Sequence, residues 1–366
     1  MTFRKAVLIA LLSGAAPAYV AAQGGGDVVG ALQPQYASVK IGSGASSRTV
    51  SQLTLPLVVV VPITSRLNFD VATSFARSEV AEPGVKTSSI SGLTDMLVRA
   101  NYTLGNDAVV ITIGANLPTG QYKIPEDQIK AAGQIGNDFL LFPTSSYGSG
   151  FSTTGGIALA RTLGNWNVGL AGSVRKSTQF DAFEASNGTG VATMTFTPGD
   201  EVRARIGADR LFGDGRLTLG VTYSAFGKDE LANTSYATGD RFIGQASLFM
   251  PIAGTDVYFN TWGLYRAKGQ QYGGVSNPES LFSGAVSAVF RSGGMTLEPN
   301  IEGRTWQVDG AKAGMLANAG VRARWTTGSL TILPSASFQA GKLYSTLDGS
   351  SLDVTGWRLG LSVRMH

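Results

Sequence analysis

The chain has no cysteine among its 366 residues, and its single histidine is the last residue, His366. The absence of cysteine excludes disulfides, thiolate nucleophiles and cysteine-ligated metal sites. Without an internal imidazole, a Ser-His-Asp triad has no base, and a two-histidine metal site has no ligands. We therefore expect the protein not to be an enzyme, and we expect no catalytic residues, no metal site and no cofactor.

Charge is also scarce. Charged residues make up 15% of the chain, whereas 48 residues are glycine. This is little charge and much glycine for a soluble protein of this length. The formal net charge is +4, and no block of lysine and arginine suggests a nucleic-acid-binding arm. We expect no nucleic-acid partner.

Long apolar runs of the kind that form transmembrane helices are absent after residue 22. The longest dense apolar stretch, residues 53–63, is rich in valine and is interrupted by Thr54, Pro56 and Pro62. A spanning helix needs about 20 predominantly apolar residues. If the chain crosses a membrane, it must do so with strands.

The first residues have the features of a secretory signal peptide. Arg4 and Lys5 are basic, residues 6–18 are apolar or small, and small residues lead up to Ala22. We predict cleavage after Ala22, with a cut after Ala18 as the rival. An uncleaved anchor is the alternative, but the apolar run is short for a bilayer core of about 30 Å.

Apolar and polar residues alternate with period two in many segments. In residues 67–75, Leu67, Phe69 and Val71 share one face, while Asn68 and Asp70 share the other. Such alternation is typical of strands with lipid on one side and an aqueous lumen on the other. The same pattern occurs in residues 94–104, 109–114, 166–175, 217–224 and 330–339.

The connections between these segments alternate in length. Short turns lie near residues 64, 105, 164, 214, 254, 293 and 328, and longer polar links lie near residues 79–90, 117–149, 177–198, 228–237, 268–277, 309–313 and 343–350. Short periplasmic turns and long outer loops are typical of outer-membrane barrels. We predict an all-β protein: a transmembrane antiparallel β-barrel of about 16 strands over residues 34–366, after a short periplasmic segment at 23–33. Fourteen strands is the alternative, because the first segment, 34–42, is weak.

The C-terminal segment has its own signal. Trp357, Leu359, Leu361 and Val363 share one face of a predicted last strand. This alternation resembles the C-terminal signal read by the outer-membrane assembly machinery, although His366 replaces the usual terminal phenylalanine. We therefore expect that machinery, and outer-membrane lipid, as partners; an ordinary edge strand is the alternative.

Three stretches resemble the outer-membrane family of the MetA pathway of phenol degradation and related transporters. They are Ser91-Gly92-Leu93-Thr94-Asp95, Ala115-Asn116-Leu117-Pro118-Thr119-Gly120, and the Gly148-Ser149-Gly150 region running into residues 155–161. The resemblance covers residues 91–176, and threonine replaces the second glycine of the first motif. It implies a barrel that passes small compounds, often hydrophobic or aromatic.

Charged residues on the predicted inward faces are the candidates for solute selectivity, because a lumen tolerates charge and the lipid face does not. Arginine predominates among them, and guanidinium groups attract anions and bind carboxylates in bidentate fashion. Ion pairs that stabilise the wall are the competing interpretation. The candidates are Arg99, Arg203, Arg205, Arg241, Glu298, Glu302, Arg304, Arg322, Arg324, Arg358 and Arg364.

Six aromatic residues fit girdles at the two membrane interfaces, where amphipathic rings are favoured. They are Tyr102, Trp166, Tyr223, Trp262, Trp325 and Trp357.

The link at residues 117–149 is the candidate constriction. A link of this length without regular structure is usually functional. Its residues 139–142 are too apolar to lie in water, so we expect them to fold into the lumen or pack on the rim. A surface loop that merely covers the mouth is the alternative.

Taken together, these patterns predict an outer-membrane pore or transporter for passive movement of small solutes. Anionic and aromatic compounds are the candidate solutes. A structural or adhesive barrel with a filled lumen is the first alternative, and an outer-membrane enzyme is the second. The sequence does not identify the solute.

Overall fold

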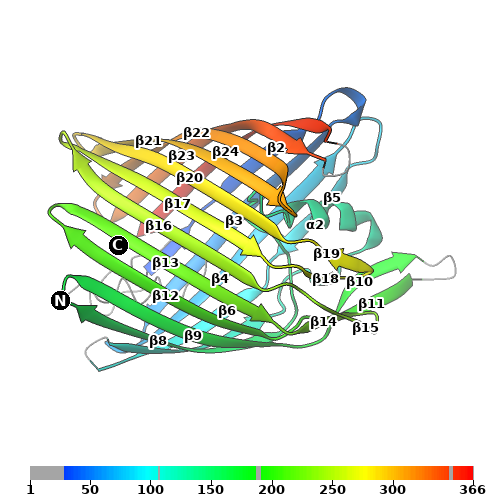
Figure 1. Ribbon diagram of the computed structural model, residues 1–366, viewed down its shortest axis with the longest axis horizontal. Helices are drawn as coiled ribbons and strands as arrows, with labels where there is room; N and C mark the ends of the chain where they lie inside the picture. Colours follow the sequence, from blue (N-terminus) through cyan, green and yellow to red (C-terminus); the bar gives the residue numbers. More distant parts are fainter. Residues whose placement is uncertain (1–28, 106–107, 187–190, 346–348, 366) are drawn as a thin grey trace.

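The computed structural model describes residues 29–105, 108–186, 191–345 and 349–365. The predicted signal peptide and His366 lie outside these residues. The described chain forms one closed antiparallel β-barrel of 16 strand positions, which confirms the predicted fold class and the larger of the two predicted strand numbers (Figure 1).

Two of the strand positions are each occupied by two consecutive strands. β1 (Val29–Leu32) and β2 (Gln35–Ile41) both lie between β3 and β24, and β5 (Ser88–Leu93) and β6 (Met96–Leu104) both pair with β4. The other positions are β3 (Arg48–Pro62), β4 (Leu67–Ala81), β7 (Val109–Leu117), β8 (Ser152–Leu163), β9 (Trp166–Ser177), β12 (Glu201–Phe212), β13 (Gly215–Phe226), β16 (Arg241–Ile252), β17 (Thr255–Arg266), β20 (Glu279–Ser292), β21 (Met295–Val308), β22 (Ala311–Thr327), β23 (Leu330–Tyr344) and β24 (Ser351–Met365).

The barrel begins earlier in the chain than residue 34. Val29–Leu32 pairs with β3 on one side, and Leu32 lies opposite Val363 of β24 on the other. Gln33 and Pro34 separate it from β2, and proline has no N–H to donate to a ladder. The predicted periplasmic segment at 23–33 is therefore wrong in its last part, because these residues complete the first strand.

The last strand closes the barrel. β24 pairs with β23 along its whole length and with β1 and β2 on its other edge, where Trp357 lies opposite Ser38. Closure leaves no free sheet edge, so the backbone hydrogen bonds of every spanning strand are made within the barrel.

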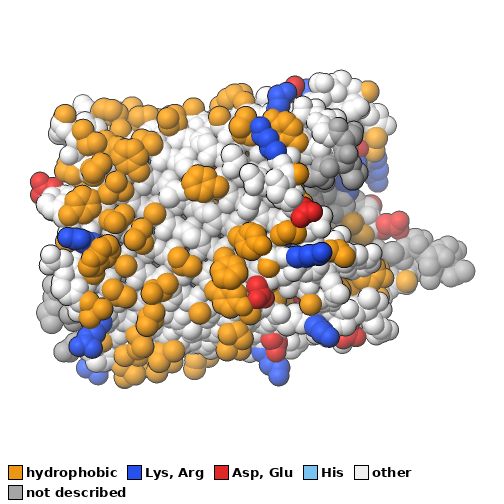
Figure 2. All heavy atoms as spheres, viewed as in Figure 1, with side chains coloured by type: hydrophobic (Ala, Val, Ile, Leu, Met, Phe, Trp, Pro, Cys, Tyr) orange, Lys and Arg blue, Asp and Glu red, His pale blue; other side chains and the backbone are white. Residues whose placement is uncertain are grey.

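The outer surface carries an apolar belt. Figure 2 shows hydrophobic side chains spread over the strands, with charged side chains mainly towards the two ends. Ile157, Leu170 and Val202 are about half exposed on this face, whereas their strand neighbours with opposite orientation are Ala158, Ala171 and Arg203. Such a surface is unfavourable in water and matches the hydrocarbon core of a bilayer. In the described part of the chain, no helix has the length and apolar character needed to cross a membrane.

The short and long connections lie at opposite ends, as predicted, except that the predicted longer link at 309–313 is a two-residue turn, Asp309-Gly310. Residues with positive φ, such as Gly105, Gly164 and Gly328, form the tight turns of one end, where a side chain would strain the backbone. The other end carries a four-stranded sheet of β10 (Phe180–Ser186), β11 (Val191–Thr197), β14 (Lys228–Leu231) and β15 (Thr234–Ala237), the hairpin of β18 (Gly269–Gln271) and β19 (Gly274–Ser276), and the short 3-10 helix η1 (Gly44–Ser46) (Figure 1).

The link between β7 and β8, residues 118–151, folds inside the barrel; we call it the lumen loop. It contains the 3-10 helix η2 (Glu126–Gln128) and the α-helix α2 (Ile129–Ile135). Its residues Phe139, Leu140 and Tyr147 are almost completely buried, in one apolar cluster with wall residues such as Val39 and Val354. The core of this protein therefore lies within the barrel, towards the end with the long connections.

Candidate functional site

Two inward arginines hold the backbone of the lumen loop. Arg304 of β21 is 6% exposed and donates from Nη1 to the carbonyl of Phe139 at 2.7 Å. Arg358 of β24 donates to the carbonyls of Leu140 and Leu141, the latter at 2.6 Å. Leu141 has φ of 50°, an unfavourable conformation for a branched side chain. It is retained because its carbonyl and those of its neighbours are engaged by charged donors.

The N-terminal strands of the wall hold the loop with neutral groups. Gln52 of β3 is fully buried and binds the backbone of Thr144 in both directions, accepting from its N–H at 2.8 Å and donating to its carbonyl at 2.7 Å. The hydroxyl of Tyr147 donates to the carbonyl of Ile90 and hydrogen-bonds to Ser78, each at 2.9 Å. Burial raises the pKa of Tyr147, so its hydroxyl stays protonated at any physiological pH.

Asp95 anchors the two ends of the lumen loop. It lies in the break between β5 and β6, and it accepts from the N–H of Ser149 at 2.7 Å, the N–H of Gly120 at 3.1 Å and Asn116 Nδ2 at 2.8 Å. A Cβ on Gly120 would lie 2.1 Å from the carbonyl oxygen of Tyr147, so only glycine fits there. These residues fall within the glycine-rich stretches singled out in the sequence, which gives those stretches a structural role.

The lumen loop covers only part of the wall. Its apolar cluster draws residues from β2–β5, β17 and β20–β24, with Ile243 of β16 at its margin. In the described chain, β8, β9, β12 and β13 contribute nothing to it. Their inward positions are largely small, for example Gly156, Ser173 and Thr222. These four strands therefore lie outside the apolar contacts of the loop; we call them the free wall.

The strand registers place all of the predicted inward residues on the lumen side, and four of the nine arginines among them are ion-paired. Arg203 binds Glu201 at 2.7 Å, Arg322 binds Glu298 at 2.5 Å and Arg304 binds Glu302 at 2.5 Å. Arg99 lies 3.4 Å from Asp70. These four arginines are part of wall ion pairs, whereas Arg205, Arg241, Arg324, Arg358 and Arg364 make no ion pair to a described carboxylate.

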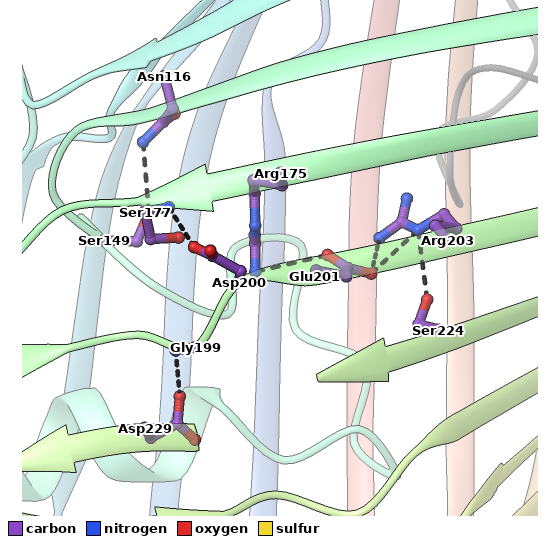
Figure 3. Close-up of polar contacts among 10 residues, drawn as sticks. All are labelled: Asn116, Ser149, Arg175, Ser177, Gly199, Asp200, Glu201, Arg203, Ser224 and Asp229. Atoms are coloured by element: carbon purple, nitrogen blue, oxygen red, sulfur yellow. Dashed lines mark hydrogen bonds and ion pairs between the residues drawn. The ribbon is translucent and has the colours of Figure 1, made fainter. Parts of the chain in front are cut away.

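Figure 3 shows how the charges of the free wall are arranged near the end with the long connections. Glu201 accepts from Arg203 and lies 3.4 Å from Arg175 of the neighbouring strand, while Arg203 Nε donates to Ser224 at 3.3 Å. The buried carboxylate of Glu201 thus forms ion pairs with both Arg175 and Arg203.

Five of the six predicted interface aromatics point outwards, and one prediction is wrong. Trp325 is 57% exposed on the outer face, Trp166 packs under the guanidinium of Arg210 at 5.4 Å, and Tyr223 donates to Asp240 at 2.6 Å; Tyr102 and Trp357 are also exposed there. Trp262 instead lies opposite Gln245 on the inward face and packs against the lumen-loop cluster.

Sequence reasoning also missed several residues that hold the loop. Trp306 stacks on Phe139 with ring centroids 5.6 Å apart and donates to Glu279 at 3.2 Å. Arg266 contacts both Glu279 at 2.5 Å and Asp138 of the loop at 3.1 Å. Both residues follow the inward alternation of their strands, so their orientation could be predicted from the sequence. Their partners on a distant loop could not be predicted in this way. No group of three or more His, Cys, Asp or Glu comes together among the described residues.

No protein-family model matches the sequence, and no curated protein matches it. Solved structures of similar form include OprB from Pseudomonas putida, at 12% identity over 93% of each chain with a TM-score of 0.48. An outer membrane channel from Pseudomonas putida F1 has 14% identity over 96% of this chain and 99% of its own, with a TM-score of 0.40. OccAB2 from Acinetobacter baumannii has 9% identity over 93% of this chain and 98% of its own, with a TM-score of 0.39.

Proposed function

We propose that this protein is a passive channel of the bacterial outer membrane for small solutes, with a preference for anions. The observation that carries the proposal is the composition of the inner wall, where arginines outnumber carboxylates. The inward arginines are Arg48, Arg99, Arg175, Arg203, Arg205, Arg216, Arg241, Arg266, Arg291, Arg304, Arg322, Arg324, Arg358 and Arg364, against Asp70, Asp95, Glu201, Asp209, Asp256, Glu279, Glu298 and Glu302.

The physical basis is a fixed positive potential in a narrow aqueous space. A guanidinium group is always charged, and rings of charged side chains select ions of opposite sign in pores. The lumen loop narrows the barrel, and the free wall offers small polar residues beside the arginines. A small hydrated anion is attracted into this space, and a cation is repelled.

The location and biogenesis belong to the same proposal. We propose that residues 1–22 are a signal peptide cleaved after Ala22, that the apolar belt contacts outer-membrane lipid, and that the last strand is the segment recognised by the assembly machinery. The resemblance of residues 91–176 to the MetA-pathway family is consistent with transport of small compounds, and membership of that family stays a prediction. The polar wall supports passage rather than catalysis.

A barrel with a filled lumen is the second candidate, and the buried cluster around Phe139 and Leu140 is the observation that favours it. If the free wall is closed as well, the protein has a structural or adhesive role. Conductance separates the two candidates, because a filled barrel passes no ions.

The test is a planar-bilayer measurement with purified protein in a gradient of potassium chloride. We expect ion conductance with a reversal potential on the anion-selective side. Replacing Arg203, Arg205, Arg322 and Arg324 together with glutamine should move the reversal potential towards cations. Absence of any conductance would favour the filled barrel, and an unchanged or cation-selective reversal potential would show that these arginines only stabilise the wall.

A further inference from the structure

We propose that the outer face of β8, β9, β12 and β13 binds one anionic glycerophospholipid, with its phosphate at Arg210 and an acyl chain in a hollow of the same face. This inference goes beyond the proposed channel function, because it concerns the surface of the barrel and not its passage. It uses the proposed location in the outer membrane. With the short turns on the periplasmic side, the lipid belongs to the periplasmic leaflet.

A hollow of about 320 Å³ lies on the outer face of these four strands. The smallest outward residues along it are Gly172 and Ala204, which lie opposite each other on β9 and β12. Larger side chains surround them, and the outward-facing ones are Ile157, Leu159, Leu170, Ile206, Val221 and Tyr223. Inside a bilayer, an apolar hollow of this kind is filled by hydrocarbon chains, which gain dispersion contacts there.

A positive charge lies beyond one end of the hollow. Arg210 is on the outward face of β12, four residues after Ile206 and about 13 Å further towards the short turns. Its guanidinium lies 5.4 Å from the ring centroid of Trp166, the residue opposite it on β9. The adjacent carboxylate, Asp209, faces the lumen and is paired with Arg216 at 2.6 Å. Among the described residues, Arg210 has no carboxylate partner.

The outward face of these four strands has only positive charges. Among the described residues of β8, β9, β12 and β13, the outward charged ones are Arg161, Lys176 and Arg210. Arg161 is exposed and lies two residues beyond Leu159, at the short-turn end, whereas Lys176 lies at the other end. Figure 2 shows basic side chains at the left edge of this face, next to the hydrophobic ones. The short-turn end therefore attracts an anionic headgroup more strongly than a zwitterionic one.

The chemistry of the pair formed by Arg210 and Trp166 fits a lipid phosphate. A guanidinium group binds phosphate through two parallel N–H···O bonds, and stacking on the ring leaves its edge available for them. Tryptophan is favoured at the level of the lipid headgroups, so the pair lies where a phosphate is present.

The spacing between charge and hollow matches one lipid molecule. Val168 and Ala208 lie opposite each other between the two, on β9 and β12. An acyl chain that passes over them from Arg210 reaches the hollow at Leu170 and Ile206. The distance of about 13 Å along the strand is less than the depth of the hydrocarbon of one leaflet, about 15 Å.

A larger hollow elsewhere on the outer surface offers a comparison. It has a volume of about 510 Å³ and is lined by residues of β20–β23 such as Ile301, Gly303 and Phe338. Towards the short turns, the described outward residues of these strands are uncharged, for example Leu297 and Trp325. This hollow therefore has an apolar surface for a chain but no cation for a phosphate on the periplasmic side.

The experiment measures lipid retained by the full-length protein in detergent, by native mass spectrometry. The protein is titrated with phosphatidylglycerol or with phosphatidylcholine of the same acyl chains. For the wild type we expect one tightly bound phosphatidylglycerol and a Kd for phosphatidylcholine about fivefold higher. Arg210→Gln should raise the Kd for phosphatidylglycerol about fivefold and remove the preference between the lipids. Gly172→Leu should raise the Kd of both lipids. An added Cβ there meets only the carbonyl oxygen of Arg203, at 4.0 Å, so the new side chain fills the hollow.

The matched controls make the same types of change elsewhere. Arg66→Gln removes an exposed arginine from the turn between β3 and β4, and Gly303→Leu fills the larger hollow, where nothing lies within 4 Å of an added Cβ. Both should leave the Kd for phosphatidylglycerol within about twofold of wild type, because distant sites act independently. Arg210→Lys keeps the charge and should keep the preference for the anionic lipid.

Several results would overturn the site. They are no retained phosphatidylglycerol in wild type, equal affinity for the two lipids, wild-type binding by Arg210→Gln or Gly172→Leu, and an equal loss of binding in the control variants. Heat-modifiable migration in gels shows that each variant is folded. Because binding is measured without current, a wild-type protein that conducts no ions would reject the proposed channel and leave the lipid site unaffected.

Discussion

The side chain of Gln52 forms the only described reciprocal pair of hydrogen bonds between the barrel wall and the lumen loop, and it is fully buried. A side-chain amide that accepts from the N–H of a residue and donates to the carbonyl of the same residue replaces a peptide group of a neighbouring strand. When one partner of such a buried pair is removed, the other keeps the full cost of desolvation. The attachment of the loop therefore depends strongly on single residues.

We predict that Gln52→Leu loosens the lumen loop without unfolding the barrel. The substitution keeps the volume but leaves the N–H and carbonyl of Thr144 unpaired, at a cost of about 1–3 kcal/mol. Single-channel recordings should show larger and noisier conductance. The matched control is Gln339→Leu, because Gln339 is 2% exposed and its Nε2 has no hydrogen-bond partner in the described chain. If both variants behave alike, the effect comes from burial and not from the loop contact.

At the scale of elements, the lumen loop is the part of the fold that sequence patterns describe least well. Alternation in residues 67–75 and 217–224 fixes which side chains face inwards, because a strand has period two and one face must be apolar. The strand number and the turn positions follow from the same regularity. The predicted outward orientation of Trp262 is wrong, because a large amphipathic ring is as favourable in an apolar cluster of the lumen as at a membrane interface.

The contacts of the loop do not follow from local patterns. The partners of Arg304 and Arg358 are backbone carbonyls more than a hundred residues away in the sequence, and carbonyls are present at every residue. The apolar run at 139–142 predicts that these side chains are buried, but it does not identify the strands against which they pack. Which arginines are free and which are paired depends on register across several strands, so the sequence alone assigns all of them the same status.

A labelling prediction tests how this element is placed. In α2, Gly133 is exposed and nothing lies within 4 Å of a Cβ added there, whereas Ala131 in the same helix is fully buried. Because the chain has no cysteine, a single introduced thiol is the only reactive one. We expect Gly133→Cys to react with a bulky impermeant maleimide on intact cells, and Ala131→Cys to stay unreactive.

Other outcomes are informative. Labelling of Gly133→Cys only after the outer membrane is permeabilised would reverse the proposed topology. Rapid labelling of both positions would show that the loop leaves the lumen. A second position suggested by sequence, Asn187, lies outside the described residues.

At the scale of the whole molecule, closure of the barrel depends on β24, the last strand to be synthesised. β24 pairs with β23 and with β1 and β2, so it forms the seam between the two ends of the chain. Until it is in place, the edges of β23 and of the first strand are both unpaired, and unpaired edges are not tolerated in lipid.

We predict that deleting residues 357–366 abolishes accumulation in the outer membrane. The deletion removes the seam and the proposed assembly signal together, so the chain should be degraded before insertion. Cell fractionation with heat-modifiability on gels measures the folded protein. The control is removal of residues 270–275 from the hairpin of β18 and β19, which forms a separate two-stranded sheet outside the barrel wall. Normal folded levels after the C-terminal deletion would contradict the assignment of the seam.

The attachments of the lumen loop have a mechanical consequence. They reach β3 through Gln52, β5 through Ile90, β17 through Arg266, β21 through Arg304 and β24 through Arg358. These strands are distributed along the wall from β17 through β24 to β5, so the loop connects several sectors of the wall across the interior. A hollow cylinder flattens easily under sideways pressure, but one with an internal cross-tie resists becoming elliptical. In the described chain no hydrogen bond joins the loop to β8, β9, β12 or β13; on this side the loop bonds to β10, outside the barrel wall, through Ile124. This sector is therefore the more compliant side of the cylinder, so lateral pressure in the bilayer should change its width first.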